Sequence, residues 1–239
     1  MDLGLAQQHA LVIGGSGGIG QAVCRVLRQE GAVVTVGDQR TPADGEASRF
    51  VTLDLADERS VRDGVAAAEA WQPLDILVNA AGIFSDTPLL KLGAAQWDRT
   101  FVVNVRGVFI TCQEALRRMV ERRRGVIVTV ASLAGQVGGL ASGPDYAASK
   151  AALAGFSKSL ARLAGPYGVR VNLVNPGIVR TPMTADWRAD LLAELTRQTP
   201  LGRLASAEEV AQVIVLLCSR AMSFVHGTHI DVNGGLYLD

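Results

Sequence analysis

Three side chains in the middle of the chain could move a proton to or from an alcohol oxygen. Tyr146 and Lys150 are four residues apart, so a helix would place them on one face, one turn from each other. A free tyrosine has a pKa near 10, and a neighbouring ammonium would stabilise the phenolate and lower that pKa. Ser132 follows a β-rich run and could hydrogen-bond a substrate oxygen on which negative charge develops. This pattern predicts an acid–base site centred on Tyr146.

A glycine-rich stretch near the start of the chain could hold phosphate groups. It comes directly after a strand-like run and leads into a helical pattern. Glycines permit a tight turn and a close backbone approach, while the helix N-terminus offers N–H groups and a positive dipole end to a pyrophosphate. We therefore expect a dinucleotide cofactor here. The residues expected at its phosphates are Gly14, Ser16, Gly17, Gly18, Ile19 and Gly20.

One acidic residue indicates which dinucleotide binds. Asp38 ends the second strand-like run, where a carboxylate can accept hydrogen bonds from both hydroxyls of the adenosine ribose. Its negative charge would repel a 2′-phosphate. Arg40 is close in sequence, but no basic residue lies between Gly15 and Gly17 to neutralise such a phosphate. We therefore predict NAD rather than NADP as the cofactor.

Short apolar runs alternate with longer helical patterns, which predicts the elements that position these residues. The runs are almost continuously apolar, so we expect a parallel sheet with helices on both faces, an α/β Rossmann-type doubly wound fold. The strands are expected at residues 10–13, 33–37, 50–53, 76–78, 126–130, 169–174 and 228–232. The helices that the argument uses are expected at residues 18–30, 95–124 and 146–164.

Composition narrows the class of protein. The 239 residues include 23 basic and 23 acidic side chains, and this balance argues against a nucleic-acid or anionic-membrane partner. With 49% hydrophobic residues, the chain can bury a large core, and no segment reaches the roughly 18 uninterrupted apolar residues of a membrane span. Three scattered cysteines without metal-ligand spacing fit a reducing compartment. We expect one cytoplasmic domain over residues 1–239, with no metal site.

The motifs together resemble those of the short-chain dehydrogenase/reductase family, and the resemblance covers essentially the whole chain. It rests on the glycine pattern, the tyrosine–lysine pair with the upstream serine, and three further motifs. These are Asp54-Leu55, Asn79-Ala80-Ala81-Gly82 and the segment Asn175-Pro176-Gly177-Ile178-Val179-Arg180-Thr181. Ile13 stands where the family usually has threonine, and Ala80 replaces the commoner second asparagine.

The resemblance implies a role for each matched residue. It implies hydride transfer between nicotinamide and a carbinol or carbonyl carbon, with Tyr146 as general acid or base, Lys150 also holding the nicotinamide ribose, and Asn104 helping to hold a water relay. The catalytic set would be Asn104, Ser132, Tyr146 and Lys150. Besides the phosphate loop and Asp38, the cofactor would contact Asp54, Leu55, Asn79, Ala80, Ala81, Gly82, Tyr146, Lys150, Pro176, Gly177, Ile178 and Thr181.

The substrate is expected between two segments. Residues 182–203 lie where the family carries a substrate lid, and Gly138 to Pro144 would form the opposite wall. One resemblance, to 3-oxoacyl-carrier-protein reductases, includes Arg123 at a carrier-docking position, but Tyr167 stands where a second docking base is usual. The other is to NAD-dependent dihydrodiol dehydrogenases of the 2,3-dihydro-2,3-dihydroxybenzoate type. It rests on residues 37–39 and 128–132.

Two expectations concern partners. The substrate would be a small alcohol or ketone, or an acyl thioester; a sensor that binds NAD without turnover is the alternative from another class. Small residues on two long helices would let a second subunit pack closely, so we expect a homo-oligomer. The family resemblance favours a homotetramer.

Overall fold

A seven-stranded parallel sheet forms the centre of the molecule. The computed structural model describes residues 2–42 and 49–238. Runs of Val, Ile and Leu make the strands, and most of their side chains are buried because helices cover both faces. The strands are β1 His9–Ile13, β2 Val33–Asp38, β3 Arg49–Thr52, β4 Ile76–Asn79, β5 Gly125–Val130, β6 Val169–Pro176 and β9 His229–Val232. All seven predicted strands are confirmed, with ends that differ by at most two residues.

The strand order creates the place where a ligand can bind. The sheet runs β3-β2-β1-β4-β5-β6-β9, so the chain builds outward from β1 to β3 and then returns to place β4 on the other side of β1. In such sheets the connections leave β1 and β4 towards opposite faces, which opens a crevice at the carboxyl ends of these two strands. Ile13 at the end of β1 pairs with Asn79 at the end of β4. The segments that follow these two residues therefore lie side by side.

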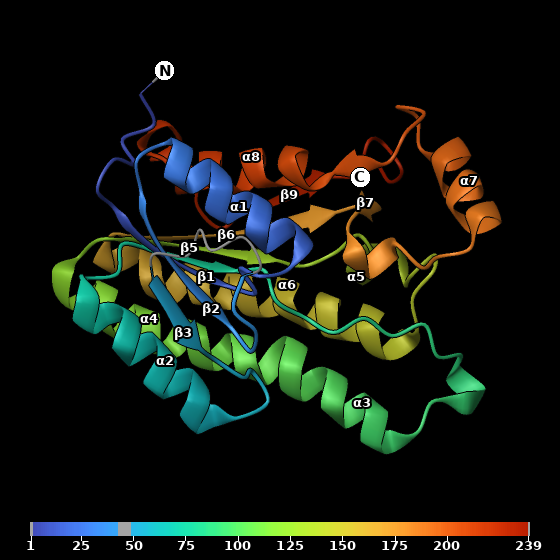
Figure 1. Cartoon of the computed structure of the whole chain (residues 1–239), viewed down its shortest axis with the longest axis horizontal. Coiled ribbons are helices and arrows are strands. Elements are labelled where there is room, and N and C mark those ends of the chain that lie inside the picture. Colours follow the sequence, from blue (N-terminus) through green and yellow to red (C-terminus); the bar gives the residue numbers. More distant parts are fainter. Residues whose placement is uncertain (1, 43–48, 239) are drawn as a thin grey trace.

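Two layers of helices enclose the sheet (Figure 1). Helices α1 and α8 cover one face, and α2, α4 and α6 cover the other. Each layer has its own apolar core against the sheet. The α-helices are α1 Gly18–Gln29, α2 Glu58–Trp71, α3 Ala94–Phe101, α4 Val108–Arg122, α5 Ala134–Val137, α6 Pro144–Ala164, α7 Ala189–Gln198 and α8 Ala207–Cys218.

Local sequence explains where several helices begin. The Asp57 carboxylate accepts hydrogen bonds from the backbone N–H groups of Arg59 and Ser60 at the start of α2. Ser206 and Glu209 form a reciprocal capping box at the start of α8. Helix α6 has Pro144 in its first turn, where the missing N–H costs nothing.

The helix expected over residues 95–124 is interrupted. Helices α3 and α4 are joined by a π-helical segment, Val102–Gly107, so the prediction of one regular α-helix was wrong in this region. A π-helical turn has one extra residue relative to the α-helical hydrogen-bonding pattern, and such turns often occur at functional sites. Asn104 lies in the middle of this segment.

A small second sheet lies at the carboxyl end of the main one. Strand β7 (Val179–Arg180) pairs in parallel with β8 (Ala205–Ser206), and the sequence pattern did not predict this pair. The pairing ties together the two ends of the segment that contains α7. Short 3₁₀ turns complete the description, at Leu89–Lys91, Gly165–Tyr167, Pro182–Thr184 and Arg220–Met222. Over the described ranges 2–42 and 49–238, no helix is long and apolar enough to cross a membrane.

Candidate active site

The glycine loop between β1 and α1 has no room for side chains at its key positions. Gly14 has a φ of +79°, and a Cβ there would lie 2.7 Å from the backbone nitrogen of Ala81. A Cβ at Gly20 would collide with the Gly14 carbonyl oxygen. Gly17, the N-cap residue of α1, has no side chain to cap the first N–H groups of the helix. The loop thus presents bare backbone and a helix N-terminus, which fits a pyrophosphate.

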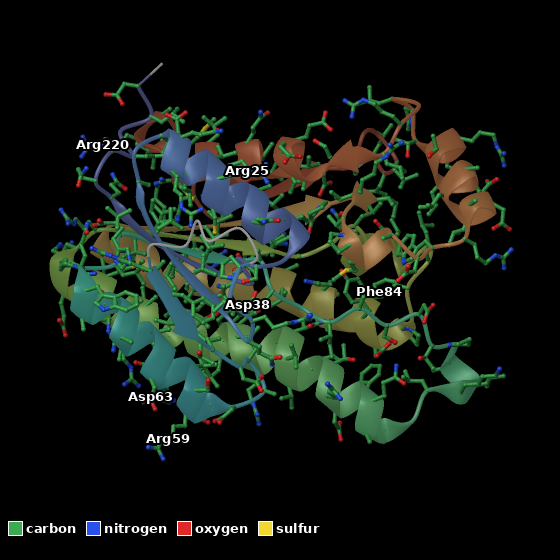
Figure 2. All side chains as sticks on the ribbon, viewed as in Figure 1. Arg25, Asp38, Arg59, Asp63, Phe84 and Arg220 are labelled. Atoms are coloured by element: carbon green, nitrogen blue, oxygen red, sulfur yellow. The ribbon has the colours of Figure 1, made fainter. Side chains whose placement is uncertain are left out.

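Asp38 reaches back from the end of β2 to this loop. Its Oδ2 accepts a hydrogen bond of 3.1 Å from the backbone N–H of Ser16, and its Oδ1 accepts one of 3.3 Å from the backbone N–H of Arg40. The Ser16 hydroxyl donates to the Arg40 carbonyl oxygen over 2.6 Å. The carboxylate is therefore fixed next to the glycine loop, where a ribose attached to the pyrophosphate would lie. Figure 2 shows Asp38 below α1, with Phe84 nearer to α7.

The segment after β3 also lies at the carboxyl ends of the strands. The Asp54 Oδ1 accepts a hydrogen bond of 2.8 Å from the backbone N–H of Ala56, so the carboxylate closes a turn. The Leu55 side chain is buried, and a Cβ at Gly107 would be 2.7 Å from the Leu55 Cβ. The Leu55 side chain therefore packs against the π-helical segment. Its backbone is the part that remains for a cofactor contact.

The segment after β4 combines a structural residue with cavity-lining ones. The Asn79 amide is buried: its oxygen accepts a hydrogen bond from the Thr111 hydroxyl over 2.7 Å, and its nitrogen donates to the Cys112 Sγ over 3.3 Å. The Asn79 side chain thus joins β4 to α4. In contrast, Ala80 and Gly82 line the main cavity. The Ala81 backbone lies so close to Gly14 that a Cβ at this glycine would collide with it.

Asn104 joins the π-helical segment to the chain that follows β4 and to α6. Its side-chain oxygen accepts a hydrogen bond of 2.8 Å from the backbone N–H of Ile83, and its nitrogen donates to the Ile83 carbonyl oxygen over 3.0 Å. The same nitrogen donates to the Ser149 hydroxyl over 3.1 Å. A Cβ at Gly82 would be 3.1 Å from the Asn104 Oδ1 and 3.4 Å from the Lys150 Nζ. The asparagine therefore lies close to Lys150, and its side-chain oxygen and nitrogen both make hydrogen bonds within the protein.

Ser132, Tyr146 and Lys150 face one another across the carboxyl end of β5. The Ser132 hydroxyl hydrogen-bonds Tyr146, and its oxygen accepts a bond of 3.1 Å from the backbone N–H of Ala134. The Lys150 Nζ donates to the Val130 carbonyl oxygen over 3.1 Å and lies 5.6 Å from the centre of the Tyr146 ring. The predicted pairing on one face of α6 is confirmed. All three side chains line the same cavity.

Burial dominates the electrostatics of this group. The surrounding protein raises the pKa of Tyr146 above its usual value, and the Ser132 hydrogen bond only partly opposes this rise. Burial also lowers the pKa of Lys150 to about 8. We expected the ammonium to lower the tyrosine pKa, and this expectation was wrong for the chain by itself, because desolvation of the phenolate outweighs the other contributions.

The segment after β6 bends back over the cavity. The Gly177 N–H donates to the Val232 carbonyl oxygen over 2.9 Å, and the Ile178 carbonyl oxygen accepts from the Ala205 N–H over 3.1 Å. A Cβ at Gly18 would be 2.7 Å from the Thr181 Cβ, so this segment approaches the start of α1. The four predicted nicotinamide residues, Pro176, Gly177, Ile178 and Thr181, all line the cavity with the tyrosine.

The cavity is largely apolar. Its volume is about 130 Å³, and it extends from Ile19 in the phosphate loop to Tyr146. The Phe84 ring packs edge-on against the Tyr146 ring, with 5.2 Å between centroids, and lies 5.4 Å from the Trp187 ring. Phe84 was not predicted as a site residue. The sequence offered only one signal for it, an aromatic side chain two residues after the motif that ends at Gly82.

Only part of the expected lid reaches the cavity. Met183, Thr184 and Trp187 line it, whereas Leu191, Leu192 and Leu195, all in α7, do not. Leu195 is buried and Leu191 and Leu192 are half-buried, so this helix packs an apolar face against the protein. On the other side, the expected wall contributes Leu140, Ala141 and Ser142.

Arg123 lies far from this cavity within its own chain. It precedes β5, whereas Ser132 follows it, and a six-residue strand spans about 20 Å. The Arg123 guanidinium donates to the Pro166 carbonyl oxygen over 2.8 Å. A carrier protein bound at Arg123 would therefore lie at the amino-terminal ends of the strands, whereas Tyr146 of the same chain lies at their carboxyl ends.

Comparison with known proteins identifies the family. Residues 14–237 match the family model described as enoyl-(acyl carrier protein) reductase. A 3-oxoacyl-(acyl-carrier-protein) reductase from Aquifex aeolicus is 35% identical, and the alignment covers 99% of this chain and 100% of that protein. A cis-4-hydroxycyclohexanecarboxylate dehydrogenase from Sinomonas cyclohexanicum is 39% identical over 96% of each chain.

A solved structure agrees with this result. The crystal structure of gox2181 has a TM-score of 0.93 and 30% identity to this chain, covering 97% of this chain and 96% of the other. The matched region and the relatives span nearly the whole sequence, and the fold is the same. The protein therefore belongs to the short-chain dehydrogenase/reductase family, whose members are oxidoreductases that generally use NAD(P).

Proposed function

We propose that the protein is an NAD-dependent oxidoreductase that interconverts a secondary alcohol and a ketone. The observation that carries this proposal is the single cavity that contains Ser132, Tyr146 and Lys150 at one end and Ile19 of the phosphate loop at the other. A hydrogen-bonded phenol at the end of a dinucleotide site has the chemistry needed to move the alcohol proton. The fit of the bare glycine loop to a pyrophosphate supports the same proposal.

The proposed chemistry assigns one task to each side chain. When bound, the nicotinamide ring supplies the hydride acceptor for oxidation and the hydride donor for reduction. Tyr146 Oη removes the hydroxyl proton in oxidation and returns it in reduction. Ser132 Oγ holds the substrate oxygen next to the phenol, and Lys150 adds positive charge and holds the nicotinamide ribose. Asn104 acts by fixing the backbone beside Lys150 and by helping to hold a water relay.

The protonation of the pair sets the expected direction of pH dependence. Because the pKa of Tyr146 is raised by burial, the phenol form predominates at neutral pH and is ready to donate a proton in reduction. Oxidation needs the phenolate, so its rate should increase as the pH rises. Lys150, with a pKa of about 8, keeps most of its charge at pH 7 and loses it above pH 8.

Asp38 is the proposed determinant of NAD over NADP. Its carboxylate is held beside the phosphate loop by the Ser16 N–H, in a position to accept bonds from ribose hydroxyls and to repel a 2′-phosphate. The change Asp38→Ala should reduce the ratio of kcat/KM for NAD to that for NADP by at least about tenfold, because a lost charge repulsion and a lost hydrogen bond act in the same direction. An unchanged ratio would show that the ribose binds elsewhere.

For the substrate we propose either a 3-oxoacyl thioester or a cyclic diol. The first is the type of compound named for the Aquifex aeolicus relative. The second candidate is a dihydrodiol of the 2,3-dihydro-2,3-dihydroxybenzoate type, a substrate that needs no carrier protein and therefore no docking base such as Arg123. The apolar cavity wall suits the carbon skeleton of either compound.

The direct test is NADH absorbance with purified protein. Secondary alcohols are offered with NAD, and ketones, including a 3-oxoacyl thioester, are offered with NADH. Turnover of at least one pair supports the proposal, and the preferred pair distinguishes the two substrate types. Tight NAD binding with no turnover of any compound would contradict it and would favour a sensor that binds NAD without catalysis.

A further inference from the structure

One polar atom in the cavity wall has no role in the chemistry described above. The Ser142 Oγ is buried and has no hydrogen-bond partner, and Ser142 lines the cavity together with Tyr146. Building on the proposed function, we propose that Ser142 is a specificity-determining residue that hydrogen-bonds a second, uncharged oxygen of the substrate. The substrate class is then an alcohol or ketone with a hydroxyl or carbonyl group near the reacting carbon.

The wall is built so that this hydroxyl is held in place. Gly138 and Gly139 both have left-handed backbone conformations, with φ values of +84° and +90°. A Cβ at Gly139 would collide with the Ser142 Oγ, so the hydroxyl packs directly over the glycine. The next residue, Gly143, donates its N–H to the Ser85 carbonyl oxygen over 2.7 Å. These contacts fix the backbone on both sides of Ser142.

Three other polar side chains at the cavity already have partners. Ser132 bonds Tyr146, the Lys150 Nζ donates to the Val130 carbonyl oxygen, and the Thr184 hydroxyl donates to the Val179 carbonyl oxygen. Among the residues that line the cavity, all within the described part of the chain, Ser142 alone has a buried side-chain oxygen without a partner. A buried hydroxyl without a hydrogen bond is costly, and a substrate oxygen would satisfy it.

The charges around the cavity indicate what kind of oxygen this is. Lys150 is the one charged side chain in the described lining, and its ammonium is at the end where Tyr146 reacts. Leu140, Met183 and Trp187 are apolar neighbours in the same lining. A substrate carboxylate beside Ser142 would be desolvated without a cation to pair with it. An uncharged oxygen would not carry this cost, and a serine hydroxyl can donate to a carbonyl or accept from a hydroxyl.

The test compares substrates with and without the second oxygen. Cyclohexane-1,2-diol is paired with cyclohexanol, and ethyl 3-hydroxybutanoate with 2-pentanol. Ser142→Ala should lower kcat/KM about tenfold for the two compounds that have a second oxygen, the size expected for one hydrogen bond, and change it less than about twofold for the other two. Ser142→Thr, which keeps a hydroxyl, should restore most of the loss. A larger loss for the diol indicates a hydroxyl partner, and a larger loss for the ester indicates a carbonyl partner.

A structural role for Ser142 makes the opposite predictions. The alanine variant loses no intramolecular hydrogen bond, so its Tm should stay within about 2 °C of the wild-type value or rise. A lower Tm together with equal losses for all four compounds would overturn the inference. Absence of wild-type turnover with all four compounds would contradict the proposed function instead. Calorimetric binding of cyclohexane-1,2-diol and cyclohexanol to wild type and Ser142→Ala would then decide the role of Ser142: an equal affinity loss for both would overturn it.

Discussion

Replacing Lys150 by methionine should make the protein more stable at pH 7 while removing its proposed activity. The lysine is buried, and burial lowers its pKa from 10.5 to about 8. The folded protein therefore binds this proton less tightly than the unfolded chain does. The buried charge therefore destabilises the fold, and this free-energy cost has its full value below pH 8. The cost decreases between pH 8 and pH 10.5 and disappears above that range. Methionine has a similar length and carries no charge.

The structure gives an approximate size for this effect. One pKa unit corresponds to about 1.4 kcal/mol, so a change from 10.5 to about 8 means that the buried charge costs about 3 kcal/mol at pH 7. The cost falls to about 1 kcal/mol at pH 10. The variant also loses the hydrogen bond from the Lys150 Nζ to the Val130 carbonyl oxygen, which contributes about 1 kcal/mol. Lys150→Met should therefore gain about 2 kcal/mol at pH 7 and almost nothing at pH 10.

Urea unfolding of wild type and Lys150→Met at pH 7 and pH 10 measures this difference. The comparison between the two proteins at each pH cancels the titration of groups that they share. A free-energy difference that does not change between pH 7 and pH 10 would refute the argument, because it would show that the lysine charge is not desolvated. A variant less stable than wild type at pH 7 would refute it as well.

Two other changes test the phosphate loop and the ion cluster that Glu114 of α4 forms with Arg62 of α2 and Arg118 of α4. Gly20→Ala should weaken NAD binding at least about tenfold in calorimetry, since its Cβ would collide with the Gly14 carbonyl oxygen; Gly155→Ala, which meets no atom within 4 Å, is the control and should bind normally. Glu114, whose side chain is 9% exposed, should contribute about 1–2 kcal/mol at pH 7 relative to Glu114→Gln. Burial raises the pKa of Glu114, but Arg118 and the neighbouring arginines lower it by a larger amount, so the net shift is downward. This stabilisation should persist above pH 4.5 and disappear on acidification below it, as measured by urea unfolding; an equal difference at pH 7 and pH 3 would contradict it.

Sequence reasoning worked best where a pattern has one structural solution. Apolar runs of three to six residues that alternate with helix-length segments predict buried strands, and all seven were found. The glycine stretch could be assigned to a phosphate loop because it lies between the first strand and a helical pattern, and in the structure a Cβ at Gly14 or Gly20 has no room. Tyr146 and Lys150 share a helix face by spacing alone.

Features that depend on tertiary contacts could not be predicted in the same way. The π-helical segment interrupts a run whose side chains still follow a helical pattern, and its stability depends on contacts such as that of Gly107 with Leu55. The direction of the Asn79 amide, into the core against α4, follows from packing between elements far apart in sequence. The pKa of Tyr146 depends on how completely the folded chain surrounds it. In each case the deciding atoms come from another part of the chain.

The most direct test of the proposed mechanism is the turnover and NAD affinity of Tyr146→Phe. This change removes one hydroxyl and keeps the ring, which packs against Phe84 with 5.2 Å between centroids. Turnover of the preferred alcohol should fall by about 10²- to 10⁴-fold, the contribution of a positioned general base, while the Kd for NAD stays within about threefold of the wild-type value. Turnover close to that of wild type, with NAD bound equally well, would show that the proton does not pass through Tyr146.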